Sequence, residues 1–321
     1  MALVHKRRYS IKIQGKGAQD PGTGLEERDI YLDGVYFTVT DFSVEKVMTR
    51  EMQRPLNYSG VAAVKITEKF GKFKFVKPLG VVQEDTGGWD GPTILPLSWV
   101  GFRPDTDAVY CKLILSDPYG INGGVGKLEA SNSEGETIRL EGMMGKVSII
   151  GEVGKVIQME IEGLGKIVDS ITWSSYEAGS NTESILSAIA GGIKIGGAVV
   201  DGIKSWRLDV GGDVKICEGV EQDDGVYLIY RPEVIGTLEI DPVDSATARA
   251  WRESEEKVNI QILRHPVGSE TEAQILIDIK EAVISEFSDE WDEDILRRRV
   301  KFEIGWQAPN KALVIYPSYD V

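Results

Sequence analysis

The sequence predicts a mainly β protein, a β-sandwich or barrel with one or two short flanking helices and two related halves. Three observations carry this prediction. Apolar and polar residues alternate in many short stretches, which is the period of a half-buried strand. Glycine, proline, asparagine and aspartate separate these stretches as turn residues do. Only one stretch, Val243–Lys257, has a convincing helical period.

The clearest strand-turn-strand pattern is Leu140–Gly163, which predicts a hairpin. Gly151 and Gly154 lie at its joint, where a positive φ would require glycine. A separate short strand, Glu136–Leu140, precedes the hairpin and ends at Gly142. Because an isolated hairpin is barely stable in water, this one must belong to a larger sheet. The apolar positions assigned to its two arms are Val147, Ile149 and Val153, then Val156, Met159 and Ile161.

The rest of the first half is predicted to consist of antiparallel strands joined by loops. Asp33-Gly34 between alternating runs is typical of a tight hairpin turn, and Lys65–Val76 alternates around Gly71 as a strand does. Two tryptophans and two prolines in Gly87–Trp99 allow only a short helix there. The other segments are an alternating basic start (Met1–Ile13), a flexible glycine-rich arm (Gln14–Gly24), a strand (Val109–Leu115) and a long exposed loop (Asp117–Gly126).

The second half follows a similar plan. Ser174–Ser187 is polar and predicts a short helix capped by Asn181 or Thr182. Asp223-Asp224-Gly225 marks a turn. The predicted strands are Ile193–Ile195, Trp206–Val210, Val226–Ile229, Thr237–Ile240, Val258–Leu263 and Ala273–Val283.

The end of the chain repeats a pattern from its middle. Arg299–Pro317 has the strand-turn-strand layout and the length of Lys146–Glu162, although few residues are identical. This similarity indicates two related β-sandwich halves. The predicted boundaries are residues 1–170 for the first half, 171–192 for a linker and 193–321 for the second half.

The charge and the apolar runs limit the possible partners. The chain has 36 basic and 51 acidic residues and a net charge of −15, which argues against a protein that grips nucleic acid by its phosphates. Its most apolar segment, Ile185–Val200, is broken by Lys194 and four glycines, so we expect no membrane span. Those glycines lack the pattern of a nucleotide-binding loop. The basic start has no apolar region of a secretory signal, and we expect synthesis and assembly in the cytoplasm.

The residues that usually carry chemistry form no recognisable site. His5 and His265 have no evident partner, and Cys111 and Cys217 lie in alternating apolar runs, where a free thiol packs as a small apolar group. The acidic cluster Asp289–Asp294 lacks the glycine and the ligand spacing of a calcium loop, and three arginines after it favour a self-neutralising surface. We therefore predict no catalytic residue, no cofactor, no metal ion and no enzyme activity.

Two stretches resemble the tail tube proteins (major tail proteins) of long-tailed bacteriophages. In that family a "GF...T...Y" segment precedes a glycine-punctuated hairpin, and a later pair of strands follows in the same order. Here the segment is Gly101, Phe102, Thr106 and Tyr110, the hairpin carries Gly135, Gly142, Gly145, Val147, Gly154 and Gly163, and the later strands lie in Ser205–Val214 and Tyr230–Pro242.

The resemblance implies a virion structural protein that self-associates into stacked rings around a channel for DNA ejection. A chain with two sandwich halves would form trimeric rings, and a chain with one would form hexameric rings. The implied partners are tape-measure and tail-end proteins, with DNA only in non-specific transit and no membrane. The implied location is the virion tail, assembled in the host cytoplasm.

Two alternatives remain open at this point. One is a single-ring tail connector or tail-tip adaptor of the same fold, which shares every feature of the sequence. The other is a β-sandwich enzyme, which would need two carboxylates at a suitable separation. For the tube, an acidic lumen would repel phosphates, and we expect the two loops Gln14–Gly24 and Asp117–Gly126 to become ordered between rings. Plain solvent-exposed loops are the other interpretation of these segments.

Overall fold

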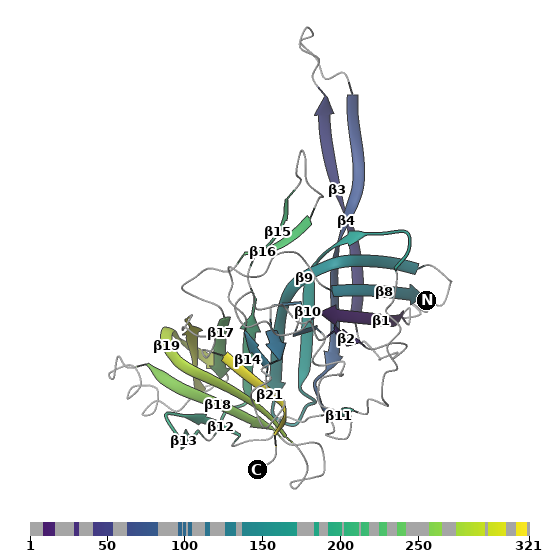
Figure 1. Cartoon of the computed structure of the whole chain (residues 1–321). Coiled ribbons are helices and arrows are strands. Elements are labelled where there is room, and N and C mark those ends of the chain that lie inside the picture. The colour runs from purple at the N-terminus through teal and green to yellow at the C-terminus, as the bar shows by residue number, and fades with distance from the viewer. Residues whose placement is uncertain are drawn as a thin grey trace, which may run out of the picture.

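The computed structural model is mainly β and antiparallel (Figure 1). The residues that it describes are 9–16, 29–31, 41–53, 63–82, 96–97, 99–100, 102–104, 113–115, 126–132, 137–171, 183–185, 192–200, 202–211, 213–217, 225–229, 236–241, 257–264, 274–292, 295–305 and 313–319. No helix among these residues is long and apolar enough to cross a lipid bilayer.

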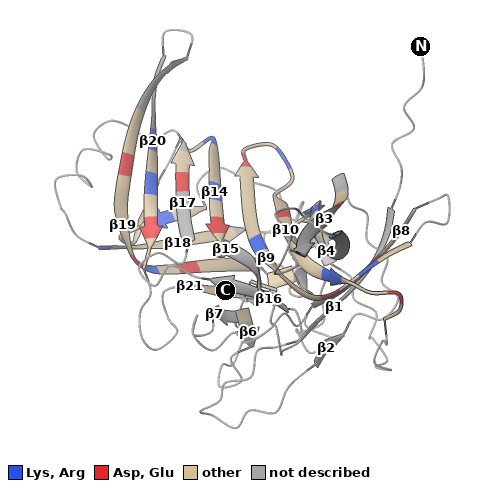
Figure 2. Ribbon diagram, turned by 90° about the horizontal axis from the view of Figure 1, so that it is seen from above, with Lys and Arg blue, Asp and Glu red and all other residues tan. Residues whose placement is uncertain are grey.

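Eight strands form one antiparallel sheet in the order β3-β4-β10-β9-β14-β17-β20-β19. Figure 2 shows them side by side. Neighbouring strands always run in opposite directions, so the two edge strands, β3 and β19, are also antiparallel to each other. The strands are β3 (Asp41–Gln53), β4 (Ala63–Pro78), β10 (Gln158–Ile167), β9 (Thr137–Glu152), β14 (Ser205–Val210), β17 (Gly236–Asp241), β20 (Ile295–Ile304) and β19 (Gln274–Asp292).

Two long strands, β9 and β19, bend out of this sheet into a second layer. The first part of β9 pairs with β8 (Gly126–Asn132), and its second part pairs with β14. In the same way, the first part of β19 pairs with β18 (Val258–Arg264), and its second part pairs with β20. Each bend coincides with a bulge that contains a positive φ, 62° at Gly142 and 52° at Glu281.

The second layer extends from these two bends. On one side β8 pairs with β1 (Tyr9–Lys16), and β1 with β2 (Asp29–Tyr31). Around β18 and β19 lie β12 (Ile193–Ile195), β13 (Ala198–Val199), β21 (Leu313–Tyr319), β7 (Leu113–Leu115) and β6 (Phe102–Pro104). Two further ribbons are β5 (Gly80–Val82) with β11 (Glu183–Ile185), and β15 (Asp213–Cys217) with β16 (Gly225–Ile229).

The core lies on one face of the eight-stranded sheet. Alternate residues of the strands are buried, for example Met159 and Ile161 in β10 and Trp206 and Leu208 in β14. They belong to one cluster with buried residues of the second layer, such as Ile277. This period-two burial produces the second face of the sheet, which carries polar residues.

Several predicted strands are confirmed. Leu140–Gly163 forms the hairpin of β9 and β10, with Val147, Ile149, Met159 and Ile161 buried. Gly154 has a φ of 81°, as expected at its joint. The strands predicted at Lys65–Val76, Ile193–Ile195, Trp206–Val210, Val226–Ile229, Thr237–Ile240, Val258–Leu263 and Ala273–Val283 are present, and part of Val109–Leu115 forms β7.

Details of the central hairpin were predicted wrongly. Val153 and Val156 are 45% and 40% exposed, because both lie in the turn rather than on the buried face. Gly151 is a strand residue whose role is space, since a Cβ there would lie 2.3 Å from the indole nitrogen of Trp206. The predicted short strand Glu136–Leu140 is not separate, because β9 (Thr137–Glu152) continues without a break through the bulge at Gly142.

Three other predictions need correction. Gln14–Lys16, assigned to a flexible arm, belongs to β1 because it pairs with β8 and β2. Glu183–Ile185, assigned to a short helix, pairs with β5 as a strand. The two strands within Arg299–Pro317 do not form a hairpin: β20 lies between β17 and β19, whereas β21 lies between β19 and β7.

Other predictions lie outside the described residues. These are the Asp33-Gly34 turn, nearly all of Asp117–Gly126, the Val243–Lys257 helix apart from Lys257, and the residues His5, His265 and Cys111. The short helix predicted within Gly87–Trp99 is described only at its end, where Pro96 and Leu97 are helical.

The bend in β19 allows a backbone test at Glu281. Its left-handed conformation is fixed by its N–H, which donates to Asn259 Oδ1 at 3.1 Å. Its carboxylate pairs with Lys257 Nζ at 2.6 Å, a contact that both Glu281→Gly and Glu281→Ala would remove. We therefore expect the glycine variant to be more stable than the alanine variant by about 1 kcal/mol in urea unfolding, since only glycine adopts this φ without strain. Equal stabilities would contradict a strained bend.

Candidate functional site: the polar face of the eight-stranded sheet

One face of the eight-stranded sheet lies opposite the core, and we call it the polar face. It carries charged residues of both signs. They alternate with core residues along each strand, as the half-buried Glu160 and Glu162 alternate with buried Met159 and Ile161. The described members are Ser43 and Glu45 on β3, Lys72 and Lys74 on β4, Glu160 and Glu162 on β10, Lys146 and Ser148 on β9, Arg207 and Asp209 on β14, Glu239 on β17, Arg299, Lys301 and Glu303 on β20, and Glu286 and Ser288 on β19.

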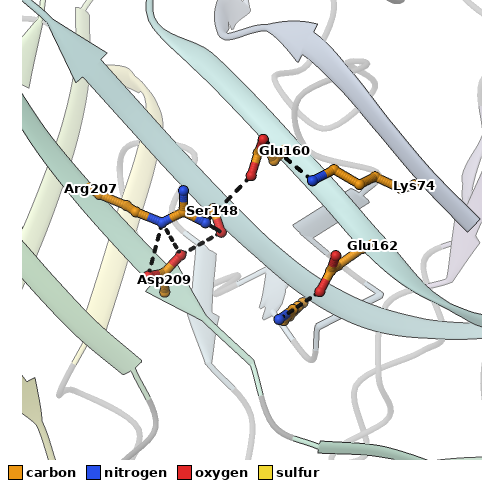
Figure 3. A network of polar contacts seen from close by, with 7 residues as sticks. Lys74, Ser148, Glu160, Glu162, Arg207 and Asp209 are labelled. Atoms are coloured by element: carbon orange, nitrogen blue, oxygen red, sulfur yellow. Dashed lines mark hydrogen bonds and ion pairs between the residues drawn. The ribbon is translucent and has the colours of Figure 1, made fainter. Parts of the chain in front are cut away.

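Arg207 is the centre of a network that joins four strands (Figure 3). Its Nε donates to Asp209 Oδ1 at 2.8 Å and Oδ2 at 3.1 Å, and its Nη2 donates to Ser148 Oγ at 2.8 Å. Nη2 also lies 3.4 Å from Glu160 Oε2, and the Ser148 hydroxyl donates to Asp209. Glu160 in turn lies 3.6 Å from Lys74 Nζ. The network thus crosses from β14 over β9 to β10 and β4.

The charges of this network shift the pKa of Arg207. Partial burial by itself lowers that pKa, but the neighbouring carboxylates of Asp209 and Glu160 outweigh the burial and raise it. The guanidinium therefore stays charged, and its geometry fixes Asp209 and Ser148 relative to each other. These two residues belong to different predicted halves of the chain, and their strands are joined by the pairing of β9 with β14.

A second contact lies on the neighbouring row of the polar face. Lys146 Nζ and Glu162 Oε1 are 2.6 Å apart, and Figure 3 labels Glu162 beside the Arg207 network. Burial alone raises the pKa of Glu162, but the hydrogen bond and charge of Lys146, with the charges of Lys74 and Lys72, lower it overall. A carboxyl with a lowered pKa is ionised at neutral pH and unsuited to act as a general acid.

The same alternation of sign continues across the sheet. On β20, Arg299 Nε lies 2.9 Å from Glu239 Oε1 of β17. Lys72 lies opposite Glu45 in the register of β3 and β4, and Lys301 lies opposite Glu239 and Glu286. The described cations of this face therefore have carboxylates as neighbours, and among the described residues it offers no cluster of free cations that would hold a phosphate chain.

Both edges of the sheet are open in the described part of the chain. The outer side of β3 has no partner strand there, and β19 from Val283 onward pairs only with β20. Val283 is an apolar residue at this edge and is 45% exposed. Unpaired strand edges favour pairing with a further strand.

Of the residues singled out in the sequence, His5, His265 and Cys111 lie outside the described part of the chain, and the described ones form no metal-binding group. The described residues contain no group of three or more histidine, cysteine or acidic side chains able to hold a metal ion. In the Asp289–Asp294 cluster, the backbone register places Asp289 opposite Arg298 and Glu290 opposite Arg297. The polar face was not predicted from the sequence, although the polar positions of each alternating strand indicated it.

The contribution of the Lys146–Glu162 pair to stability depends on pH. Because the folded-state pKa of Glu162 is lowered, its stabilisation is present above the ordinary pKa of glutamate and is lost as pH falls through the folded-state value. We expect Lys146→Met to lower the free energy of unfolding by about 0.5 kcal/mol at pH 7, with a smaller loss at acidic pH. Urea unfolding across this range measures the difference.

The control for this experiment is Lys155→Met. Lys155 and Glu152 form an ion pair of 2.8 Å at the exposed turn of the same hairpin. Because both partners are well solvated, we expect almost no change in stability at any pH. A loss at Lys146 that is independent of pH would contradict the ionic explanation and indicate that the lysine acts through packing.

No protein-family model and no curated protein matches this sequence. The features that bear on function are the sheet, its two open edges in the described chain and its polar face.

Proposed function

We propose that this chain is a virion structural protein of the phage tail tube type, which assembles into rings that stack around a channel for DNA. The observation that carries the proposal is the eight-stranded sheet with two open edges. Its edge strands, β3 and β19, run in opposite directions. Copies related by rotation about an axis along the strands would therefore join edge to edge with antiparallel pairing, which closes a continuous barrel and removes the open edges.

The composition of the two faces supports the same proposal. One face of the sheet packs on the core, and the other is the polar face. In a closed ring the polar face would line the channel. Charges of both signs alternate there, so DNA phosphates meet repulsion beside every attraction and find no cationic track to bind. The net charge of −15 adds long-range repulsion.

Ring stacking is supported by ribbons at the opposite ends of the sheet. Residues 63–67 of β4 pair only with β3 in the described chain, beyond the last pair of β4 and β10 at Phe70 and Lys166. Figure 1 shows this ribbon rising out of the body. At the other end of the sheet, residues 295–299 of β20 pair only with β19 in the described chain, beyond the last pair of β20 and β17 at Val300 and Ile240. A two-stranded ribbon is marginally stable alone, so contacts with a neighbouring ring would stabilise both.

The composition of the sheet supports a trimeric ring. The halves 1–170 and 193–321 each contribute four of the eight strands. If six β-sandwich domains line a ring, as the resemblance implies, and each half supplies one of them, three chains complete it. Six chains remain the alternative if the second half is an elaboration rather than a repeat.

The test is the assembly state of the full chain. Native mass spectrometry at increasing concentration is expected to show trimers, and negative-stain electron microscopy is expected to show rings and tubes. A chain that stays monomeric at every concentration and salt would overturn the proposal. Rings that never stack would favour the alternative, a single-ring connector or tail-tip adaptor, and counting copies per virion would then separate the two roles.

A further inference from the structure

The eight-stranded sheet contains the same strand arrangement twice. In chain order, the first four strands are β3, β4, β9 and β10, and the last four are β14, β17, β19 and β20. In both sets the third strand lies outside the fourth, which gives the sheet orders β3-β4-β10-β9 and β14-β17-β20-β19. Equivalent strands also run in the same direction. The contact of β9 with β14 therefore joins the third strand of one set to the first strand of the next.

The two bulges align the sets residue by residue. Gly142 and Glu281 both have a positive φ, and each stands next to the last residue that pairs with the second layer, Met143 or Ala282. Both of these residues are fully buried. Gly142 is thus equivalent to Glu281, and the bends occur at the same place in the two sets.

The strand register, followed from this pair of bulges, shows which polar residues are equivalent. Gly145 and Ile284 are equivalent, and their neighbours across the sheet lead to Val44 and Leu208. One residue further along the first strands, Glu45 is equivalent to Asp209. β19 has a further register shift between Ile284 and Glu286. Beyond this shift, Ser288 is equivalent to Ser148, because Ser288 pairs with Arg299 and Ser148 pairs with Glu160, and these two partners are equivalent.

We propose that β3 of one copy pairs with β19 of the next copy as β14 pairs with β9 within the chain, with Glu45 opposite Ser288. Within the chain Ser148 faces Asp209 in the register and donates a hydrogen bond to it. The serine and the carboxylate are both retained at the equivalent positions of the open edges. This inference rests on the proposed ring and names the contact that closes it.

Both junctions bring opposite charges together, although at different positions. Within the chain, cationic Arg207 of the first strand lies 3.4 Å from anionic Glu160 of the fourth strand. Between copies, Ser43 takes the place of Arg207, and anionic Glu45 lies opposite Ser288, whose other neighbour in the register is cationic Arg299. The edges also have matching exposure: Ser43 and Glu45 are exposed, as are Val283, Ser285 and Glu286 on β19. A second copy of this chain therefore fits the edge in chemistry and in strand direction.

A disulfide between the variants Glu45→Cys and Ser288→Cys tests the pairing. Opposed residues of an antiparallel pair have Cα atoms about 4.5–5.5 Å apart, within the range of a disulfide. Within one chain the two positions are separated by seven strand spacings, roughly 30 Å, so the bond can form only between copies. Oxidation of the double variant is expected to give a covalent ladder that ends at the closed ring in a non-reducing gel.

The controls separate this contact from assembly itself. The two single variants report cross-links made through Cys111 or Cys217, and Glu45→Cys with Lys194→Cys places the second thiol on exposed β12, away from the edge. These controls are expected to give no ladder. Rings seen by microscopy without a ladder in the double variant would overturn the edge pairing and leave the proposed function standing. A double variant and wild-type chain that are both monomeric would overturn both.

A charge variant provides a second readout. Glu45→Arg would bring two cations together at the junction, so we expect at least a tenfold rise in the concentration needed for ring formation. Because Glu45 also lies opposite Lys72 within the chain, we expect a small drop in the thermal stability of the monomer, of the size that an exposed ion pair contributes. Glu152→Arg makes the same change of charge on an exposed residue at the β9–β10 turn and is expected to assemble as the wild type does. Equal assembly of both variants would overturn the proposed junction.

Discussion

Gly163→Ala is expected to lower the free energy of unfolding by about 3 kcal/mol, the upper end of what overpacking usually costs. A Cβ at this position would stand 2.1 Å from the carbonyl oxygen of Met144 and 2.7 Å from the Cα of Gly145. Both atoms belong to the backbone of β9, which is paired on its other side with β14. The clash cannot be relieved by a side-chain rotation, so the strands must separate. Urea unfolding followed by circular dichroism measures the loss.

The matched control is Gly154→Ala in the same hairpin. Gly154 has a φ of 81°, and a Cβ there would meet nothing within 4 Å. Alanine should therefore cost only the backbone strain of the left-handed region, about 1 kcal/mol. If the two variants lose equal stability, the close approach of β9 and β10 does not account for the glycine at position 163.

The close approach at Gly145 and Gly163 also positions the segment that covers them. The two glycines face each other in the register of β9 and β10, and the N–H of Gly145 donates to the carbonyl oxygen of Trp99 at 3.2 Å. The turn at Pro96–Val100 thereby reaches the sheet, with N–H groups of Trp99 and Val100 bonded to Pro96 and Leu97. The glycine pair is thus a packing feature of the first half.

Strands that alternate strictly could be predicted in full from the sequence, whereas β3 and β19, which contain bulges, were missed or predicted only in part. β10 and β14 alternate without interruption, and their buried residues are the predicted ones. β3 was missed because a bulge between Val47 and Thr49 shifts its period and charged residues fill much of its length. β19 was predicted only to Val283, because its bulge at Glu281 moves it to a different partner.

The polar face depends on pairings that no local pattern contains. Ser148 and Asp209 are 61 residues apart in sequence, and Arg207 and Glu160 are 47 apart. Each residue alone has the composition of a solvated strand position. Strand order makes them neighbours, and that order is set by contacts between distant segments. The expected repeat at Arg299–Pro317 failed for the same reason, since its two strands pair with different parts of β19 and not with each other.

Trp99→Ala is expected to destabilise the protein by about 4 kcal/mol, as large-to-small substitutions of buried aromatic residues do. Trp99 is 1% exposed and packs edge-on against Phe73 and Phe75, with ring centroids 5.7 Å and 6.1 Å apart. Both phenylalanines lie on β4 and are fully buried. The truncation would leave a cavity over them at the strand next to the β3 edge, so ring formation should weaken as well.

Two further variants make this prediction specific. Trp99→Phe keeps an aromatic ring against Phe73 and should lose less than half as much stability as Trp99→Ala, because part of the edge-on packing remains. Val153→Ala removes an apolar group that is 45% exposed at the hairpin turn, and its effect should stay within about 0.5 kcal/mol. If Trp99→Ala costs no more than Val153→Ala in urea unfolding, Trp99 does not hold the turn at Pro96–Val100 against β4, and the first half must be stabilised elsewhere.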